Sequence, residues 1–440
     1  MVSSIIYKNS KIAVYGMGIT GRSVATTLKK LGAQIYCWDD NIKTRKKAKD
    51  LNFSINKFWD KKNYIDKIVI SPGIDISKCK IKNYLNANKN KIITDLDIFF
   101  DINKKCLIIS ITGTNGKSTT CKIIEKILKA AKYKVRTVGN IGKPILSLSK
   151  VEKKYAIILE VSSYQLQYSK IFRSNHAAIL NISPDHLDRH KNIKNYINIK
   201  SKIFFSQNKS DYSYVNSNNK YSKDIINVFK NKKIKSKLIT INESVFDLFV
   251  HKVKNKYFNN KGNAENMAFA YKIAKNLKIK DKIIIKSLNK FRGLPHRQEV
   301  VFSDKKLLCI NDSKATSFDA SLQSLSNFNK IYWIVGGVPK YQDNFYLKKV
   351  KKKIVKAYVI GKNILFFKNQ IKKDIPFSVS KNIKTAVNHI FKDLKSDKKS
   401  KKTILLSPAA SSFDQFSNFE NRGNEFKNLI TKKFIKRSNV

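Results

Sequence analysis

Two glycine-rich turns carry the clearest chemistry in this sequence. The stretch ITGTNGKSTT, residues 111–120, has the composition of a phosphate-binding loop. The usual spacing G-x-x-x-x-G-K-[ST] would need glycine at Ile111, so this loop is a short version. Its backbone amides can wrap phosphate oxygens, Lys117 can reach the β and γ groups, and Ser118 can ligate Mg²⁺. The sequence predicts that ATP binds here, to Gly113, Thr114, Asn115, Gly116, Lys117, Ser118 and Thr119.

The second turn is VYGMGITGRS, in which Gly16, Gly18 and Gly21 have the spacing G-x-G-x-x-G. Such a turn between a strand and a helix lets backbone N–H groups approach a phosphate. Asp39 follows at the end of the next expected strand, where it could bind a ribose. A nucleotide of some kind is favoured over a turn that serves packing alone. An NAD-linked role is disfavoured because a separate ATP loop follows.

Two further segments deliver polar side chains after expected strands. LEVSSYQL places Glu160 at a strand end, and NISPDHLDRH places His186 between Asp185 and Asp188 just after another. In parallel sheets the carboxyl ends of strands meet at one edge, where sites open. A carboxylate and an imidazole beside a phosphate loop therefore predict a Mg²⁺ site.

The elements that position these residues alternate along the chain. Apolar runs of four to seven residues, such as KIAVY, QIYCW, CLIISIT, YAIILE, IYWIVGG and TILLSP, are separated by longer amphipathic stretches. This alternation is typical of α/β architecture with parallel sheets. We expect three α/β domains, with boundaries at 1–97, 98–299 and 300–440.

Composition adds limits on function and location. The formal net charge is +58, which would favour a polyanionic partner. However, only nine of the 89 basic residues are arginine, and Lys, Asn, Ile, Phe and Tyr, which share A/T-rich codons, are all abundant. Compositional drift is therefore the favoured explanation, and a polyanion role stays the alternative. Five scattered cysteines indicate reduced thiols, and no apolar run approaches the ~20 residues of a membrane span. With no secretory signal evident at the start, we expect a cytoplasmic protein without membrane insertion.

In several motifs the chain resembles the Mur ligases of peptidoglycan synthesis. The matching text is ITGTNGKST, GNIG (139–142), LEVSSYQL, NISPDHLDRH and FRGLPHRQE. The resemblance implies a Rossmann-like UDP-binding domain, a central P-loop domain and a C-terminal Rossmann-like domain. In this family the first turn holds a UDP-linked substrate and the short loop holds ATP. The implied UDP-substrate contacts are Ile19, Thr20, Asp39, Asp40, Ser71, Pro72, Gly73 and Asn140.

The last third resembles the branch of the family that adds D-glutamate to UDP-N-acetylmuramoyl-L-alanine. The segments are INDSKATSFDA (310–320), GGVPKYQD and LLSPAASSFDQFSNFENRGNEF (405–426). A dicarboxylate substrate needs ammonium, hydroxyl and backbone N–H donors, which these segments supply. The implied D-glutamate contacts are Lys314, Thr316, Lys340, Ser412, Phe413 and Phe419.

The resemblance also implies the catalytic set. Lys117, Glu160, His186 and Lys200 would act in catalysis, with two Mg²⁺ ions held by Ser118, Glu160, His186 and Lys200. Lys200 aligns with a family lysine that is carried as its carbamate. Further ATP contacts would come from Asn263, Asn266, His296, Arg297 and Asp312.

Two departures from the family pattern are visible. In FNNKGNAEN, Asn260 and Gly262 replace the family's glycine and histidine, and Asn41 stands near a basic uridine contact that Lys43 or Arg45 could supply instead.

Rival hypotheses are another amide ligase of the superfamily, such as a folate polyglutamylating enzyme, and a basic ATP-driven nucleic-acid-binding protein. The first glycine turn disfavours the folate branch. The absence of aromatic–basic interleaving disfavours the nucleic-acid protein. We therefore expect small-molecule substrates, no nucleic-acid partner and a monomer.

Overall fold

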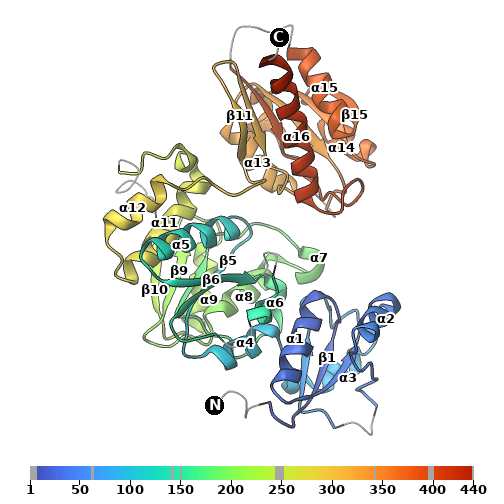
Figure 1. The fold of residues 1–440 in the computed structure, drawn as a ribbon, viewed down its shortest axis with the longest axis vertical. Coiled ribbons are helices and arrows are strands. Elements are labelled where there is room, and N and C mark those ends of the chain that lie inside the picture. Colours follow the sequence, from blue (N-terminus) through green and yellow to red (C-terminus); the bar gives the residue numbers. More distant parts are fainter. Residues whose placement is uncertain are drawn as a thin grey trace. The chain divides into compact units, whose positions relative to one another are not determined.

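Apolar segments form the strands of three sheets in the computed structural model of the chain. The structure describes residues 7–60, 64–139, 143–148, 151–242, 252–340, 343–394 and 401–438. By its contacts the chain divides into two units, Met1–Phe291 and Arg292–Val440, and each is described by itself (Figure 1). The α/β class with three sheet-containing regions, predicted from the alternating pattern, is confirmed.

The first sheet has the strand order β2-β1-β3-β4, and all its pairings are parallel. Its strands are β1 (Lys11–Tyr15), β2 (Gln34–Trp38), β3 (Lys67–Ile70) and β4 (Ile92–Ile93). The helices of this part are α1 (Ile19–Lys30), α2 (Ile42–Asp50), α3 (Lys82–Ala87) and α4 (Asp95–Asn103). The first glycine turn lies between β1 and α1, as its sequence predicts.

The second sheet has the order β10-β9-β8-β5-β7-β6 and is also parallel. Its strands are β5 (Leu107–Thr112), β6 (Lys134–Gly139), β7 (Tyr155–Glu160), β8 (His176–Ile179), β9 (Tyr212–Asn216) and β10 (Lys237–Ile241). Its helices are α5 (Lys117–Ala130), α6 (Ser163–Gln167), α7 (Leu187–His190), α8 (Ile193–Ser201), α9 (Ser222–Asn231), α11 (Lys261–Asn276) and α12 (Asp281–Asn289). The central strand β5 carries the phosphate loop, with β7 and β8 on either side of it.

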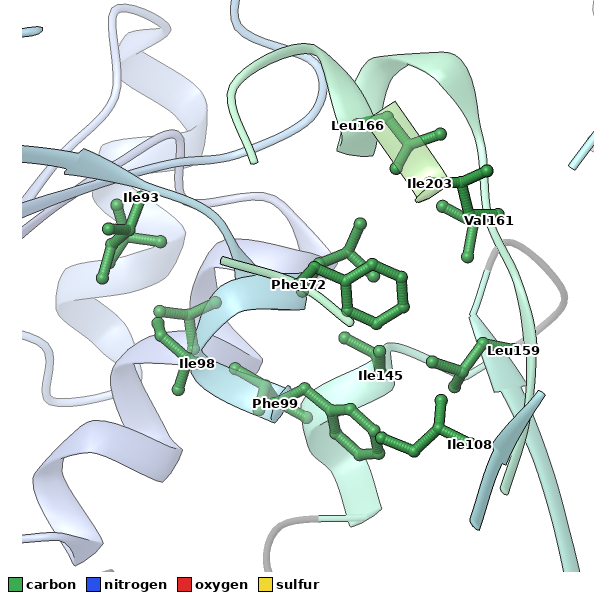
Figure 2. Packing of buried hydrophobic residues seen from close by; sticks show 14 of the residues in the cluster. Ile93, Ile98, Phe99, Ile108, Ile145, Leu159, Val161, Leu166, Phe172 and Ile203 are labelled. Atoms are coloured by element: carbon green, nitrogen blue, oxygen red, sulfur yellow. The ribbon is translucent and has the colours of Figure 1, made fainter. Parts of the chain in front are cut away.

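One hydrophobic core joins these first two sheets. Ile12 and Val14 of β1 belong to the same buried cluster as Phe99 of α4 and Phe172 beside the second sheet. Figure 2 shows Ile98 and Phe99 of α4 lying near Ile145, with Phe172 close by. The predicted boundary at residue 97 falls within α4, and Asp97 accepts hydrogen bonds from the backbone N–H groups of residues 170–172. The three-domain boundaries stay a prediction.

The second unit holds a sheet of order β11-β12-β16-β13-β14-β15. Its strands are β11 (Glu299–Ser303), β12 (Leu307–Asn311), β13 (Ile331–Gly336), β14 (Ile354–Ile360), β15 (Phe377–Lys381) and β16 (Lys402–Leu406). Its helices are α13 (Phe318–Asn327), α14 (Ile364–Ile371), α15 (Ile383–Asp393) and α16 (Phe419–Ser438). Separate apolar clusters pack α13 and α14 on one face and α15 and α16 on the other.

The edge strand β11 differs from the expected parallel pattern. It pairs with β12 in the antiparallel sense, because only three residues, 304–306, connect the two strands. A parallel pair needs a crossover of a dozen or more residues, so this short connection fixes a hairpin. None of the described helices is both long and apolar enough to span a membrane.

Candidate active site

The phosphate loop leaves β5 at Thr112 and enters α5 at Lys117. Gly116 caps the helix with φ +84°, a conformation that favours glycine. A Cβ atom at Gly116 would approach Oδ1 of Asn266 more closely than the 3.0 Å that real Cβ atoms respect. The loop is thus built tightly against α11.

Hydrogen bonds from the segment after β8 brace this loop. Thr114 N donates to Asn181 O at 3.0 Å, and Asn115 N donates to Asn181 Oδ1 at 2.9 Å. Asn181 Nδ2 returns a bond to Asn115 O at 3.1 Å. The ammonium group of Lys117 lies 2.8 Å from both Gly113 O and Thr114 O. Asn181 therefore holds the shape of the loop, and Lys117 is already folded over it.

Glu160 stands at the same sheet edge as the loop. It ends β7, pairs in register with Ile111 of β5 and Gly139 of β6, and is only 3% exposed. The sheet therefore places this buried residue beside the strand that carries the loop. Ser118, on the first turn of α5, is likewise 4% exposed.

His186 follows β8 in a left-handed conformation, φ +55°, at the start of α7. Its Nδ1 lies 2.9 Å from the hydroxyl of Tyr164 on α6, and its Nε2 lies 3.4 Å from Asp185 Oδ2. Tyr164 comes four residues after Glu160, so one short segment supplies the carboxylate and fixes the imidazole. Together these contacts set the orientation of the ring.

Lys200 is buried, which the helical pattern of its segment does not predict. It is 1% exposed, and its Nζ donates to Gly113 O at 3.0 Å and to Thr112 Oγ1 at 3.2 Å. Burial, reinforced by the positive charge of Lys117, holds the Lys200 pKa well below its usual value, against the opposing charges of Asp185 and Glu160. The charges of Lys117, Asp185 and Glu160 all act on Lys200, so these side chains lie near one another.

The amides of Asn263 and Asn266 on α11 are buried and used within the fold. Asn263 Nδ2 donates to Tyr257 O at 2.9 Å, and Asn266 Oδ1 accepts from Thr120 Oγ1 at 3.1 Å. Asn260, which departs from the family pattern, caps α11 by accepting from Asn263 N at 2.9 Å. This departure therefore serves the helix start.

The first glycine turn is closed by Asp39. Its carboxylate accepts from Met17 N at 2.7 Å and from Asn41 N at 2.9 Å. Asp40 is held by Tyr15 Oη at 2.6 Å.

Other predicted UDP-substrate residues surround the same edge. Ser71 Oγ donates to Gly16 O at 2.6 Å, so the segment Ser71-Pro72-Gly73 after β3 adjoins the turn. Ile19 is 68% exposed and Thr20 half-buried at the start of α1. Asn41 caps α2, and Arg45 lies over the ring of Trp38. Asn140 lies outside the described residues.

The predicted D-glutamate residues occupy loops at the carboxyl ends of β12, β13 and β16. Lys314 Nζ lies 3.8 Å above the ring of Phe419. An antiparallel bridge between Val338 and Ser411 brings the segment of Lys340 alongside that of Ser412. Ser412 is buried, Thr316 is half-buried and Phe413 is 73% exposed. The sheet order thus gathers all three loops.

Asp312 lies in the same unit, in a serine-lined interior. It accepts from Ser324 Oγ at 2.6 Å, Ser407 Oγ at 3.0 Å and Gln298 N at 3.2 Å. Burial raises its pKa to about 6. His296 is 6% exposed, with Nδ1 2.9 Å from Asn311 Nδ2, and the charge of Arg297 acts on Asp312.

The donor set fits Mg²⁺ beside a phosphate better than a closed metal centre. Among the described residues there is no cluster of three or more His, Cys, Asp or Glu side chains that could hold a metal. Mg²⁺ is usually bound by one or two carboxylates together with waters and substrate phosphates. The carboxylate of Glu160 and the hydroxyl of Ser118, next to a phosphate loop, match this preference, and the imidazole of His186 is the third candidate ligand.

A family profile, a curated protein and a solved structure are all similar to this chain. The profile of the Mur ligase middle domain matches residues 111–284. The UDP-N-acetylmuramoylalanine–D-glutamate ligase of Rickettsia bellii (strain RML369-C) is 37% identical over 444 residues, covering 96% of this chain and 98% of that protein. MurF from Acinetobacter baumannii shares the fold, with a TM-score of 0.57 at 14% identity over 97% of this chain and 92% of its own.

Fold alone does not separate the amide ligases. The bifunctional folylpolyglutamate synthase/dihydrofolate synthase from Yersinia pestis CO92 also matches, with a TM-score of 0.54 at 17% identity over 78% of this chain and 93% of its own. Sequence identity across the whole length is what separates these branches.

Proposed function

The chain belongs to the Mur ligase family, and we propose that it joins D-glutamate to UDP-N-acetylmuramoyl-L-alanine while ATP is cleaved to ADP and phosphate. The observation that carries this proposal is the 37% identity to a ligase of that name over nearly the full length of both chains. The burial of Glu160 beside the phosphate loop and the contacts of Lys200 with that loop support the proposal. The product would be a precursor of peptidoglycan.

The chemistry must first turn a carboxylate into an electrophile. The substrate carboxylate attacks the γ-phosphorus of ATP, so ADP leaves and an acyl phosphate forms. The amine of D-glutamate then attacks the acyl carbon, phosphate leaves, and the nitrogen loses a proton. The first step brings two anions together, so fixed positive charge and N–H donors supply most of the catalysis.

Each residue has a role in that step. The loop amides from Gly113 to Gly116, held by Asn181, bind the phosphate oxygens. Lys117 exchanges its contacts with the loop carbonyls for the β and γ phosphates. Ser118, Glu160 and His186 would hold Mg²⁺, which when bound neutralises phosphate charge and orients the attacking carboxylate. Tyr164 keeps the His186 ring in place.

Lys200 would supply a further metal ligand beside the phosphate loop. Its buried amine, in the neutral form, can add CO₂, forming a carbamate and releasing one proton. The resulting anion would lie beside Lys117 and would help to hold a second Mg²⁺. The low pKa of Lys200 supports this proposal, because only the neutral amine reacts with CO₂.

The proposal is tested by substrate-dependent phosphate release. Purified protein with ATP, Mg²⁺ and UDP-N-acetylmuramoyl-L-alanine is offered D-glutamate, L-glutamate, L-lysine or meso-diaminopimelate separately. We expect phosphate with D-glutamate only. Release with another amino acid, or with none, contradicts the assignment to this branch.

We further propose a cytoplasmic monomer that acts on small molecules without a nucleic-acid partner. The basic composition is distributed along the whole chain, in keeping with solvated surfaces. Light scattering measures the mass. A DNA-binding titration at several salt concentrations tests the partner, since real phosphate contacts would give a steep salt dependence.

A further inference from the structure

Arg422 is an arginine buried at the start of α16. It is 1% exposed and among the largest fully buried side chains of the chain. Within the described residues no carboxylate lies close enough to form an ion pair with it, and the nearest charge acting on it is that of Asp414. A buried cation without a close ion-pair partner is costly and is normally kept for a reason.

The guanidinium ties together loops that carry the predicted D-glutamate contacts. Nη2 donates to Ser313 O at 2.8 Å and to Ala410 O at 2.9 Å, and Nε donates to Ser313 Oγ at 3.0 Å. Ser313 Oγ in turn donates to Phe419 O at 2.8 Å. Ser313 precedes Lys314, and Ala410 lies two residues before Ser412. One side chain therefore links the loops after β12 and β16 with the start of α16.

The remaining nitrogen of Arg422, Nη1, lies beside the segment that follows β13. Nη1 is buried and has no hydrogen-bond partner. A Cβ atom at Gly337, where φ is +137°, would lie 3.3 Å from it. Gly337 leads into Lys340 through Val338, which bridges to Ser411. The unsatisfied donor thus lies at the centre of the loops.

We propose that Arg422 is a positioning residue of the D-glutamate site, which orders its loops and supplies a buried positive charge for the dicarboxylate. This inference rests on the proposed ligase activity. The planar guanidinium donates from two nitrogens at once, Nη2 to the carbonyls of Ser313 and Ala410 and Nε to Ser313 Oγ, and the single ammonium nitrogen of a lysine does not reproduce that fork. Only nine of the 89 basic residues of this chain are arginine, so an arginine at this buried position favours a specific role for its guanidinium. The negative charges of the substrate would then add to the partial compensation that the charge of Asp414 provides.

The test compares Arg422→Lys, Arg422→Met and Ser313→Ala with a matched control. The control is Arg173→Lys, which breaks a two-bond pair with Asp211, at 2.7 and 3.1 Å, in the first unit. For each protein, KM is measured for D-glutamate, ATP and UDP-N-acetylmuramoyl-L-alanine, together with the melting temperature. We expect R422K to raise KM for D-glutamate about tenfold and R422M to raise it further, because a buried donor fork is lost.

KM for the other two substrates should stay within about twofold of wild type, whereas R173K should change no KM. A KM for D-glutamate that stays at the wild-type value in R422K and S313A, with only the melting temperature lowered, overturns the inference. An equal rise in all three KM values overturns it as well. If R422K fails to fold, the milder S313A decides. A wild-type protein that releases no phosphate with D-glutamate refutes the proposed function itself, whereas an active wild type with unaltered variants refutes only the role of Arg422.

Discussion

Replacing Gly116 by alanine separates the cost of backbone strain from the cost of losing the phosphate loop. The chain offers a matched control in Gly32, in the turn between α1 and β2. The two glycines have almost the same φ, +84° and +85°. A Cβ at Gly32 meets nothing closer than 3.4 Å, whereas one at Gly116 collides with Asn266. The difference between the two variants therefore reports on the collision.

The magnitude follows from these contacts. A side chain in the left-handed region costs about 1–2 kcal/mol, and Gly→Ala regains about 0.4–1 kcal/mol by restricting the unfolded chain. These contributions are common to both variants. At Gly116 alone, the Asn266 amide must move and leave the hydroxyl of Thr120, which adds about 1–3 kcal/mol for a broken buried hydrogen bond. We also expect kcat/KM for ATP to fall at least about 100-fold, or about 2.7 kcal/mol.

The assay pairs chemical denaturation with steady-state kinetics on wild type, G116A and G32A. G32A should keep its kinetics and lose little stability. The reasoning is refuted if G116A matches G32A in both stability and kcat/KM for ATP, because the loop would then not depend on close approach to α11.

Three other predictions concern Lys200, Asn181 and His176 of the first unit. Lys200→Ala should lower turnover about 100-fold or more and abolish any stimulation by bicarbonate; undiminished turnover would remove its proposed role. Asn181→Ala removes the amide that braces Asn115, so KM for ATP should rise about tenfold while KM for the UDP substrate stays constant; equal changes in both would argue against a specific brace. Burial lowers the pKa of His176 from 6.5 to about 4, so the unfolded chain binds the proton more tightly and stability falls as pH drops from 6.5 toward 4. The loss is about 3 kcal/mol, and His176→Gln should flatten that part of the unfolding profile relative to wild type.

Much of the fold could be predicted from apolar runs and turn residues. The strand YAIILE is β7 to the residue, and KIAVY and QIYCW are β1 and β2. Nearly all residues of β1 and β7 are buried, so their continuous apolar runs mark them well, and the edge strand β2 keeps such a run although it is only partly buried. The strands β6, β10 and β15 carry alternating polar residues and gave no such run.

Side-chain environments were harder to predict than strands. The segment around Lys200 reads as an exposed, lysine-rich helix, and only the fold places its ammonium against the phosphate loop. Asn181 and Arg422 stand inside the motifs that indicated the family, yet nothing local distinguishes a bracing asparagine from a solvated one. Their roles depend on contacts between segments more than 60 residues apart in the chain. Such contacts arise from strand order, which short-range patterns do not encode.

The apolar core shared by the first two sheets affects the cooperativity of thermal unfolding. Ile12 and Phe172 belong to one buried apolar cluster. Cleaving the chain near residue 97 would therefore leave two pieces that each expose apolar surface. Residues up to Phe291 should instead denature in a single cooperative step. The capacity to retain a sugar nucleotide and the capacity to retain ATP should accordingly disappear at one shared midpoint.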